Sequence, residues 1–422
     1  MKGATPPNDR LRVLVLIQGS LGERPAGPEI RGWEIARAFS KRHAVTAVAR
    51  VPAPSTREGI EVIPHSRRNL LRALRGHDVV LGPVLPPYAL VGGGRCLRVA
   101  DLYDPVELEL ATIGGWRGRR HARRQRQSRR LQLRWADVVL CANERQREGI
   151  ERELAGLSRA AAPRLLTVPM GLPAAPPASA DHPLRERFGP IGPRDPLVLW
   201  WGSAWRWLDA ASAVEAIGIL VQRRPDLRMV ITAGRPANAA TDPLNATEDV
   251  RALARERGLL DRNVFFLDEW VPFDQRHRYL ADADLGITLH ADTAEATLAA
   301  RARYMDCVWA SLPQVVAEGD EVAERLGQAG AASLVPPKDP AAAAAAIDAL
   351  LGDRDRLENA ALACRRVAAE YRWPALLDPL VDCVEQSSPA PRSAGLLLRA
   401  GAQAGRYYSA RAVDRGLAIA RS

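Results

Sequence analysis

Carboxylate and guanidinium side chains lie close together in one stretch of the C-terminal half of the chain. The stretch 292–313 contains Glu295 and Asp306, with ten residues between them, and the arginines Arg301 and Arg303. Carboxylates accept hydrogen bonds from sugar hydroxyl groups, and guanidinium groups pair with phosphate oxygens. These residues are candidates for ligand binding, although each side chain could instead serve packing or the solvation of a helix.

A second pair of carboxylates, Asp101 and Asp104, lies in the segment V-A-D-L-Y-D-P, directly after an apolar run. Side chains that follow a parallel strand lie at the edge of the sheet where ligands bind. An Asp-Pro step also favours a turn, so one of the two aspartates could simply cap that turn. The sequence does not choose between them.

Metal and thiol chemistry are not indicated by the spacing of candidate ligands. Asp282 and Asp284 form a D-x-D pair, but they precede an apolar strand and so lie at the wrong end of a sheet for a ligand. The five cysteines are scattered without a C-x-x-C pair, which favours buried reduced thiols over disulfides or a zinc site. We therefore expect no metal.

Motifs for common cofactors are missing as well. Only three of the 59 basic residues are lysines, and none lies in a G-x-x-x-x-G-K-[ST] loop, which excludes a P-loop NTPase. A pyridoxal Schiff base would have to form on Lys338, in the turn P-P-K-D-P. No G-x-G-x-x-G follows a first strand, which disfavours an NAD or FAD enzyme. We expect no cofactor.

The positive charge is concentrated in two segments. The chain has 422 residues, is 47% hydrophobic and 26% charged, and has a net charge of +10. Nine arginines and no acid lie in 116–134, and six arginines against one aspartate lie in 387–422. The segments 114–134 and 387–422 are interpreted as solvated helix faces or as contacts with an anionic membrane surface. Nucleic acid is not the expected partner, because aromatic residues are not interleaved with the arginines.

No apolar run approaches the roughly 18 residues that a membrane-spanning helix needs, and the first residues lack a signal-peptide cleavage site. We expect a cytoplasmic protein, with peripheral attachment to the inner face of the membrane as an open alternative.

Short β-branched runs alternate with helix-length amphipathic stretches over most of the chain, which indicates β-α-β units and parallel sheets. A segment rich in proline, glycine and alanine interrupts this pattern once. We predict an α/β protein with two doubly wound Rossmann-like domains that face each other across a cleft. The predicted parts are an N-terminal domain at 10–171, a linker at 172–196, a C-terminal domain at 197–372, a helix crossing back at 373–386 and a basic tail at 387–422.

Four segments in this order resemble the GT-B fold glycosyltransferases of family 4, in particular bacterial members with a D-L-Y-D-P strand end. The segments are G-P-E-I-R-G-W-E-I-A-R-A-F-S-K-R-H-A-V-T-A-V, V-P-M-G-L-P, N-V-F-F-L-D-E-W-V-P-F-D-Q-R-H-R-Y-L-A-D-A-D-L-G-I-T-L-H and D-C-V-W-A-S-L-P-Q-V-V-A-E-G-D. The likeness covers about residues 10–386. It implies transfer of a sugar from a nucleotide-sugar donor to a cell-envelope glycan, lipid-linked or other small acceptor, with retention and without a required metal.

The resemblance also implies roles for individual residues. The acceptor would lie against the first domain, with Asp101 or Asp104 as its catalytic or orienting acid, and the donor against the second. Glu295 would take the first and Asp306 the second position of the family's glutamate pair. Ser203 stands where many relatives have a phosphate-binding arginine, and no lysine follows, so other arginines would have to supply the charge. The donor-binding residues implied are Gly27, Arg31, Gly202, Ser203, Arg206, Glu269, Trp270, His290, Arg301, Arg303 and Asp306.

Two alternatives stay open because of these departures from the family pattern. One is a nucleotide-sugar isomerase or pseudo-glycosyltransferase on the same fold, which would consume a donor without an acceptor. The other is a catalytically silent GT-B protein that acts as a scaffold.

Overall fold

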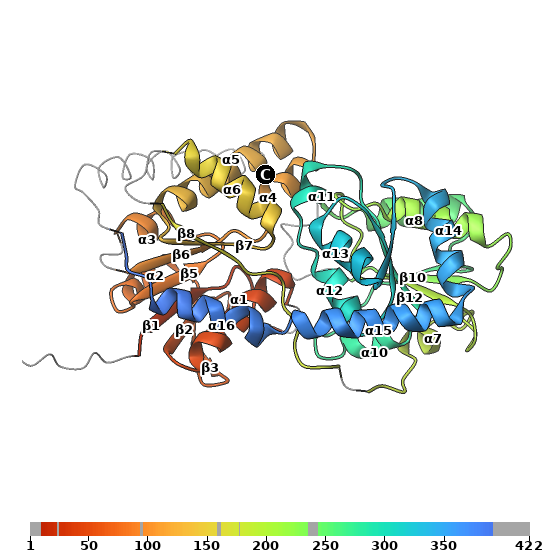
Figure 1. Cartoon of the computed structure of the whole chain (residues 1–422), viewed down its shortest axis with the longest axis horizontal. Helices are drawn as coiled ribbons and strands as arrows, with labels where there is room; N and C mark the ends of the chain where they lie inside the picture. The colour runs from red at the N-terminus through yellow and green to blue at the C-terminus, as the bar shows by residue number, and fades with distance from the viewer. Residues whose placement is uncertain are drawn as a thin grey trace, which may run out of the picture.

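The computed structural model describes residues 10–22, 25–92, 96–157, 162–176, 178–234 and 244–390. Two sheets, each with helices packed on its faces, lie side by side in the long direction of the molecule (Figure 1). This arrangement confirms the predicted pair of Rossmann-like units.

The first sheet has the strand order β3-β4-β2-β1-β5-β6-β7-β8, and all of its pairings except β3 with β4 are parallel. Its central strands are apolar runs buried on both faces, as parallel sheets covered by helices require. The strands are β1 (Arg12–Leu16), β2 (Ala44–Ala49), β3 (Ser55–Arg57), β4 (Ile60–Pro64), β5 (Val79–Gly82), β6 (Leu97–Asp101), β7 (Val138–Cys141) and β8 (Arg164–Thr167).

Helices cover both faces of this sheet. Alternate residues of β1 separate the two faces, because Val13 and Val15 pack in the core cluster with α1 and α16, whereas Leu14 and Leu16 pack with α2, α3 and α5. The helices are α1 (Gly27–Ser40), α2 (Arg67–Leu74), α3 (Pro87–Gly92), α4 (Val106–Ala111), α5 (Gly115–Trp135) and α6 (Glu144–Ala155).

The second sheet is parallel throughout, with the order β11-β10-β9-β12-β13-β14. Strand β9 lies between β10 and β12, so the strand order reverses at β9, as it does at β1 in the first sheet. Ligands bind at such reversal points. The strands are β9 (Leu197–Trp200), β10 (Arg228–Thr232), β11 (Val264–Leu267), β12 (Leu285–Thr288), β13 (Gln314–Ala317) and β14 (Ala332–Val335).

One expected helix of the second domain is broken. The sequence predicts a single helix from about Glu295 to Trp309, but the structure has a five-residue helix, an extended break at 299–301 and then a second helix. The helices of this half are α7 (Pro183–Arg187), α8 (Ala210–Leu220), α9 (Thr247–Glu256), α10 (Arg276–Ala281), α11 (Ala294–Leu298), α12 (Ala302–Trp309), α13 (Glu321–Ala329), α14 (Pro340–Leu351), α15 (Arg354–Glu370) and α16 (Trp373–Glu385).

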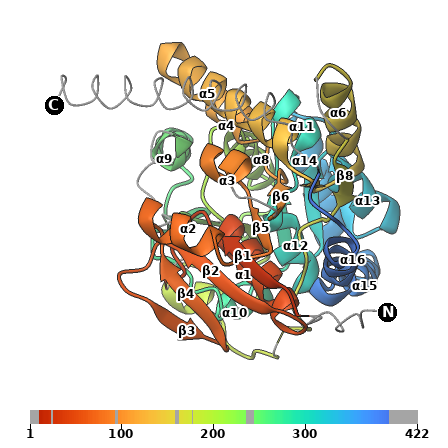
Figure 2. The ribbon, with the colours of Figure 1, turned by 90° about the vertical axis from the view of Figure 1, so that its left-hand side faces the viewer.

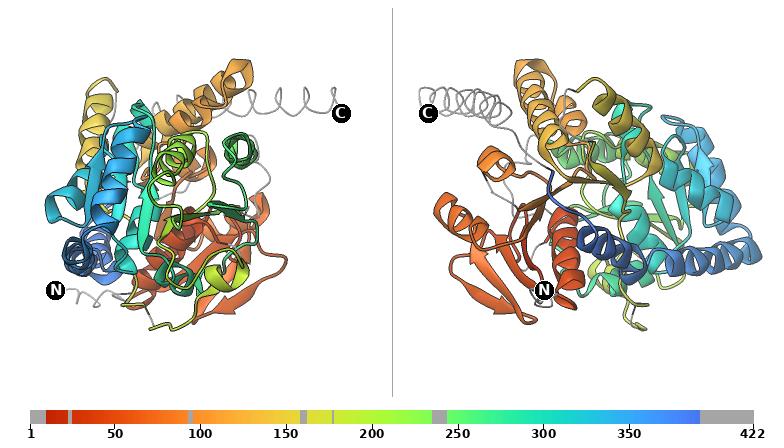
Figure 3. Two further views of the ribbon diagram at one scale, coloured as in Figure 1. Left: turned by 90° about the vertical axis from the view of Figure 1, so that its right-hand side faces the viewer. Right: turned by 60° about the vertical axis from the view of Figure 1, so that its left-hand side comes forward.

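The chain crosses between the domains twice, and the two crossings lie side by side. The Leu172 amide donates to the Tyr371 carbonyl oxygen at 2.6 Å, and the Trp373 amide donates to the Leu172 carbonyl oxygen at 3.0 Å. Only glycine fits at position 171, because a Cβ there would lie 2.3 Å from the Trp373 ring. Helix α16 then lies along the first domain, against α1 (Figures 1 and 3).

Part of the expected linker is packed structure rather than a free connection. Helix α7 lies within 172–196, and its Leu184 is fully buried. Arg185 donates from Nε to Asp282 Oδ1 at 3.1 Å and pairs with Asp284 at 3.3 Å. The D-x-D aspartates thus fasten this segment to the second domain at the amino end of β12.

Among the described residues, no helix combines the length and the apolar composition needed to cross a lipid bilayer. Of the predicted basic tail at 387–422, residues 391–422 lie outside the described ranges.

Candidate functional site

The amino ends of two helices, one from each domain, meet between the two sheets. A Cβ atom at Gly27, the first residue of α1, would lie 3.8 Å from the Cβ of Ala302, the first residue of α12. Free amide groups and the helix dipole make such an end attractive to anions. Among the described residues no side chain caps α12; the Tyr304 amide donates to the Arg301 carbonyl oxygen at 3.1 Å, which leaves the amides of Ala302 and Arg303 for a ligand.

Arg303 lies on the first turn of α12 and brings a guanidinium group to this place. Its Nη2 donates to the Ser203 carbonyl oxygen at 3.1 Å, while its Nη1 is buried and has no hydrogen-bond partner among the residues that the structure describes. Burial, with a smaller contribution from Arg301, lowers the pKa of Arg303 to about 10. No carboxylate of the described residues forms an ion pair with Arg303, so an anionic ligand would meet an unneutralised cation.

The loop after β9 approaches Arg303 closely. Gly202 has φ of +88°, a conformation that favours glycine, and a Cβ there would lie 3.3 Å from Arg303 Nη2. Ser203 is buried and donates from Oγ to the Gly234 carbonyl oxygen at 2.8 Å. Ser203 therefore holds the loop, and the positive charge of the loop comes from Arg303, on a different element. Arg206, in the same loop, pairs with Asp249 on α9 at 3.3 Å.

Arg301, only two positions before Arg303, is neutralised. Its two terminal nitrogens donate to the two carboxylate oxygens of Glu295 at 3.0 and 3.3 Å, and both side chains are buried. Burial lowers the pKa of Arg301, but Glu295 together with Tyr304 and Asp320 more than offsets this effect, so the pKa is raised. The break at 299–301 makes this pair possible, because it lets the chain fold back on α11.

His290 lies behind this ion pair and is fully buried. Its Nε2 is 3.5 Å from Asp320 Oδ2, the oxygen that also accepts from the Tyr304 hydroxyl group at 3.2 Å. Arg301 Nε approaches the same oxygen at 3.8 Å. His290 Nε2 nevertheless forms no hydrogen bond among the described residues, and Nδ1 lies 3.0 Å from the Ala291 carbonyl oxygen.

The second predicted acid of the donor site, Asp306, is held by two side chains. It accepts from Trp201 Nε1 at 3.0 Å and from Arg276 Nε at 3.1 Å. The Arg276 guanidinium group lies 3.7 Å from the centre of the Phe273 ring and 4.0 Å from that of Trp309. The sequence analysis did not identify Arg276, because nothing in the residues around it indicates a contact with Asp306.

Asp101 and Arg31 form a buried ion pair across the first domain. Arg31 donates from Nε and Nη2 to the two oxygens of Asp101 at 2.8 and 2.9 Å, and from Nη1 to the Pro169 carbonyl oxygen at 3.0 Å. Its guanidinium group also lies 4.6 Å from the centre of the Tyr103 ring. The sequence indicated a phosphate contact for Arg31 and a cleft-facing acid at Asp101, but each has the other as its main partner.

Asp104 has a different environment from Asp101, because it lies among carboxyl groups. Burial, and next the Glu295 carboxylate, raise the pKa of Asp104 to about 7. Burial, and next Asp104, raise the pKa of Glu109 well above its usual value. Helix α4, which carries Glu109, packs against α11, which carries Glu295. Three carboxyl groups from the two domains therefore converge, and Glu109 is a member that sequence reasoning missed.

The end of β11 approaches the end of β10 at Gly234. A Cβ there would lie 2.7 Å from the Glu269 carbonyl oxygen and 2.9 Å from the Trp270 Cα. The Glu269 side chain is exposed and pairs with Arg187 at 3.0 Å, which lowers its pKa. Trp270 has a buried indole nitrogen without a hydrogen-bond partner in the structure.

Polar contacts join the two domains beside these groups. Gln146 Nε2 donates to the carbonyl oxygens of Leu298 at 2.7 Å and Tyr103 at 2.8 Å. Arg145 donates to the Gly319 carbonyl oxygen at 2.6 Å and pairs with Glu324 at 2.6 Å. The amino end of α6 is thus fixed against the second domain, next to the candidate site.

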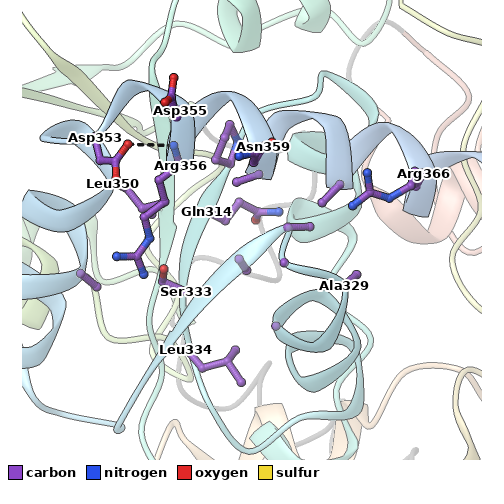
Figure 4. A pocket seen from close by; sticks show the side chains of 18 residues that line it. Gln314, Ala329, Ser333, Leu334, Leu350, Asp353, Asp355, Arg356, Asn359 and Arg366 are labelled. Carbon is purple, nitrogen blue, oxygen red and sulfur yellow. Dashed lines mark hydrogen bonds between the residues drawn. The ribbon is translucent and has the colours of Figure 1, made fainter.

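A cavity of about 790 Å³ lies elsewhere, between β14, α13, α14 and α15 (Figure 4). It includes Gln314 and Ala332, the first residues of β13 and β14, and so opens at the amino ends of the strands. None of the predicted site residues lines it. The candidate site is therefore the region between the domains.

No protein-family model and no curated protein sequence matches this chain. Solved structures do match. Sucrose-phosphate synthase from Thermosynechococcus elongatus has a TM-score of 0.68 at 16% identity. Anabaena HepE in complex with UDP-glucose has 0.66 at 15%, and WaaG, a glycosyltransferase involved in lipopolysaccharide biosynthesis, has 0.63 at 15%. Each comparison covers 89% of this chain and 99% of the other. The chain has the GT-B fold.

Proposed function

We propose that the protein is a glycosyltransferase that moves a sugar from a nucleotide-sugar donor to a glycan acceptor. Arg303 carries the proposal, because it is a cation without a carboxylate partner in the described ranges, held where the amino ends of α1 and α12 meet. A diphosphate would supply the missing negative charge and accept from the open amides.

The proposed role of Arg303 in the reaction follows from the negative charge that develops on the leaving diphosphate. When the bond between the sugar C1 and the diphosphate oxygen breaks, negative charge grows on the diphosphate. Fixed donors already aimed at that position stabilise this charge without reorganisation. Arg303 and the first amides of α12 are such donors, and the Gly202–Ser203 loop brings the backbone close to them.

The acid group formed by Asp104, Glu109 and Glu295 is proposed to lie on the sugar and acceptor side. Glu295 is held by Arg301 and can still accept hydrogen bonds from the donor sugar. Asp104 is proposed to accept the hydrogen bond of the incoming acceptor hydroxyl group. Arg31 and Asp101 then act as positioning residues, which fix the start of α1 against the end of β6.

The finer parts of the proposal rest on the resemblance to family 4 and on the fold. They are retention of configuration, no requirement for a metal, and an acceptor that is a cell-envelope glycan or a lipid-linked intermediate handled at the inner face of the membrane. HepE is described in complex with UDP-glucose and WaaG as a glycosyltransferase of lipopolysaccharide biosynthesis, which supports a nucleotide sugar and a glycan as the ligand classes. Neither the isomerase nor the scaffold alternative gains support from these matches.

A calorimetric screen of UDP, GDP, ADP, CMP and dTDP tests the donor site. One nucleotide should bind, and Arg303→Gln should weaken it about 10- to 100-fold, as expected for a hydrogen bond to a charged group. Arg255→Gln, on the exposed side of α9, is the matched control and should bind like the wild type. Absence of binding by all five at millimolar concentration would contradict a donor site.

Transfer itself is tested with the corresponding labelled nucleotide sugars and a cell-envelope extract as acceptor. Labelled product should form with and without EDTA, because no metal takes part in the proposed reaction. Consumption of the donor without any acceptor product would favour the isomerase or pseudo-glycosyltransferase instead.

A further inference from the structure

The amino end of α6 is closed by a reciprocal cap. Asn143 is the N-cap residue, and its Oδ1 accepts from the Gln146 amide at 2.8 Å. In return, Gln146 Oε1 accepts from the Ala142 amide at 2.8 Å. Glutamine and glutamate both complete a cap of this kind, because only the side-chain oxygen takes part. The cap therefore explains why position 146 is glutamine or glutamate, and does not explain the choice between them.

The side-chain nitrogen of Gln146 has a partner in each domain. Nε2 donates to the Tyr103 carbonyl oxygen at 2.8 Å and to the Leu298 carbonyl oxygen at 2.7 Å. The side chain is buried, and both donor positions of its amide group are used. A glutamate could not form these two bonds, because a carboxylate only accepts. The contacts between the domains thus account for glutamine at this position.

The two carbonyl groups belong to the segments that carry the acids assigned to acceptor and donor. Tyr103 directly precedes Asp104, after the end of β6. Leu298 is the last residue of α11, the helix that carries Glu295, and its carbonyl oxygen lies at the helix end, where a partner from outside the helix is needed. Figure 2 shows α4, α11 and α6 next to one another. The Gln146 side chain therefore links the backbone beside Asp104 to the helix of Glu295.

We propose that Gln146 is a positioning residue for glycosyl transfer, which fixes the separation between Asp104 and Glu295. This inference deepens the proposed function and rests on it. Asp104 is assigned to the acceptor hydroxyl group and Glu295 to the donor sugar, so their separation decides how closely the two substrates approach. A misplacement of about 1 Å can lower the rate of such a reaction about 100-fold.

A neighbouring contact between the domains does not reach these segments. Arg145 donates to the Gly319 carbonyl oxygen and pairs with Glu324 on α13, and both charged side chains are partly exposed. An exposed ion pair contributes little to stability. Arg145→Gln therefore removes a contact between the domains while it leaves the link between the two acids in place.

The labelled transfer assay, run with the nucleotide sugar whose nucleotide binds, tests the role of Gln146. Gln146→Glu keeps the oxygen that caps α6 but directs an acceptor at two carbonyl oxygens, and Gln146→Met removes the bonds without adding charge. We expect kcat to fall about 100-fold in both variants. The KM for the donor and the nucleotide affinity should not change, because Gln146 does not contact Arg303. Gln328→Glu, at an exposed position of α13, should match the wild type in all three quantities.

The pH dependence separates lost donation from altered packing. A protonated glutamate can donate one hydrogen bond, so the kcat of Gln146→Glu relative to that of Gln146→Met should rise as the pH falls from about 8 to about 5. The surrounding carboxylates favour proton uptake by the new glutamate in this range. The titratable and charged groups on the elements around position 146 are shared by the two variants, and they are Tyr103, Asp104, Glu109, Glu144, Arg145, Glu295, Arg301 and Glu321.

Several results would overturn the proposal. Wild-type kcat in both Gln146 variants would do so, and so would an equal loss in Arg145→Gln, because any contact between the domains would then suffice. A loss in Gln146→Glu alone would assign the effect to the added charge. Gln146→Glu keeps the cap of α6 and should keep the unfolding temperature, so it remains informative if Gln146→Met does not fold. A wild type that binds none of the five nucleotides would instead contradict the donor site, and this inference with it.

Discussion

The two domains each place a neutralised charge next to one that is not. In the second domain Arg301 forms a buried ion pair with Glu295, whereas Arg303, two residues later, has no carboxylate partner among the described residues. In the first domain Asp101 is paired with Arg31, whereas Asp104, three residues later, lies among carboxyl groups. The paired charges hold the elements in place, and the other two, Arg303 and Asp104, are the ones that our proposal assigns to the substrates.

The largest expected change in stability comes from breaking one of the paired charges. Asp101→Asn leaves Arg31 buried without a counter-charge, which should lower the free energy of unfolding by about 3–5 kcal/mol. Denaturant titration measures this. Arg147→Gln, which breaks an exposed pair on α6, is the control and should change it by about 0.5 kcal/mol or less. A loss below 1 kcal/mol for Asp101→Asn would show that the pair is not a structural support.

Replacing the unpaired cation, Arg303, should raise the stability of the protein, whereas replacing Asp101 should lower it. Arg303→Met removes a charge whose pKa is already lowered by burial, so we expect stabilisation of about 1–2 kcal/mol together with loss of nucleotide binding. Thermal unfolding without ligand gives the first quantity and calorimetry the second. Destabilisation by Arg303→Met would mean that Arg303 is a structural residue like Arg301.

The unpaired carboxyl group should appear in the pH dependence of stability. The pKa of Asp104 is raised in the folded protein to about 7, so its stabilising contribution is present below its ordinary pKa and is lost as the pH rises through about 7. Asp104→Asn should therefore remove about 2–3 kcal/mol of this decline between pH 5 and 8. Glu148→Gln, an exposed carboxyl group on α6, serves as the control, and an unchanged slope in Asp104→Asn would refute the assignment.

The smallest effect concerns the loop that adjoins Arg303. Gly202→Ala places a side chain at φ of +88° and against the Arg303 guanidinium group, and should cost about 1 kcal/mol of stability. Binding of the nucleotide should fall as well, because Arg303 must move. Gly149→Ala on α6, where a Cβ meets nothing within 4 Å, should preserve both stability and binding.

The sequence was sufficient for the architecture because local patterns determine it. Buried apolar runs such as 13–16 and 138–141 alternate along the chain with helices, and this alternation indicates parallel strands. The placement of Asp101, Asp104 and His290 at or beyond strand ends could also be predicted, since the direction of a parallel strand decides which residues reach its carboxyl edge.

The partners of these residues could not be predicted, because they depend on contacts between distant segments. Arg31 and Asp101 are 70 positions apart, and nothing in either neighbourhood encodes their pairing. The break at 299–301 lies in a stretch of alanines and arginines with high helix propensity, so tertiary contacts override the local preference. Glu109 and Arg276 were missed for the same reason.

The most direct test of the account compares binding of a nucleoside, its monophosphate and its diphosphate to the wild type and to Arg303→Gln. If Arg303 holds the donor diphosphate, the affinity of the wild type should rise with each phosphate, and Arg303→Gln should lose most of the gain from the diphosphate while binding the nucleoside unchanged. Equal losses for the nucleoside and the diphosphate would contradict the account, because Arg303 would then support the shape of the site rather than the phosphates.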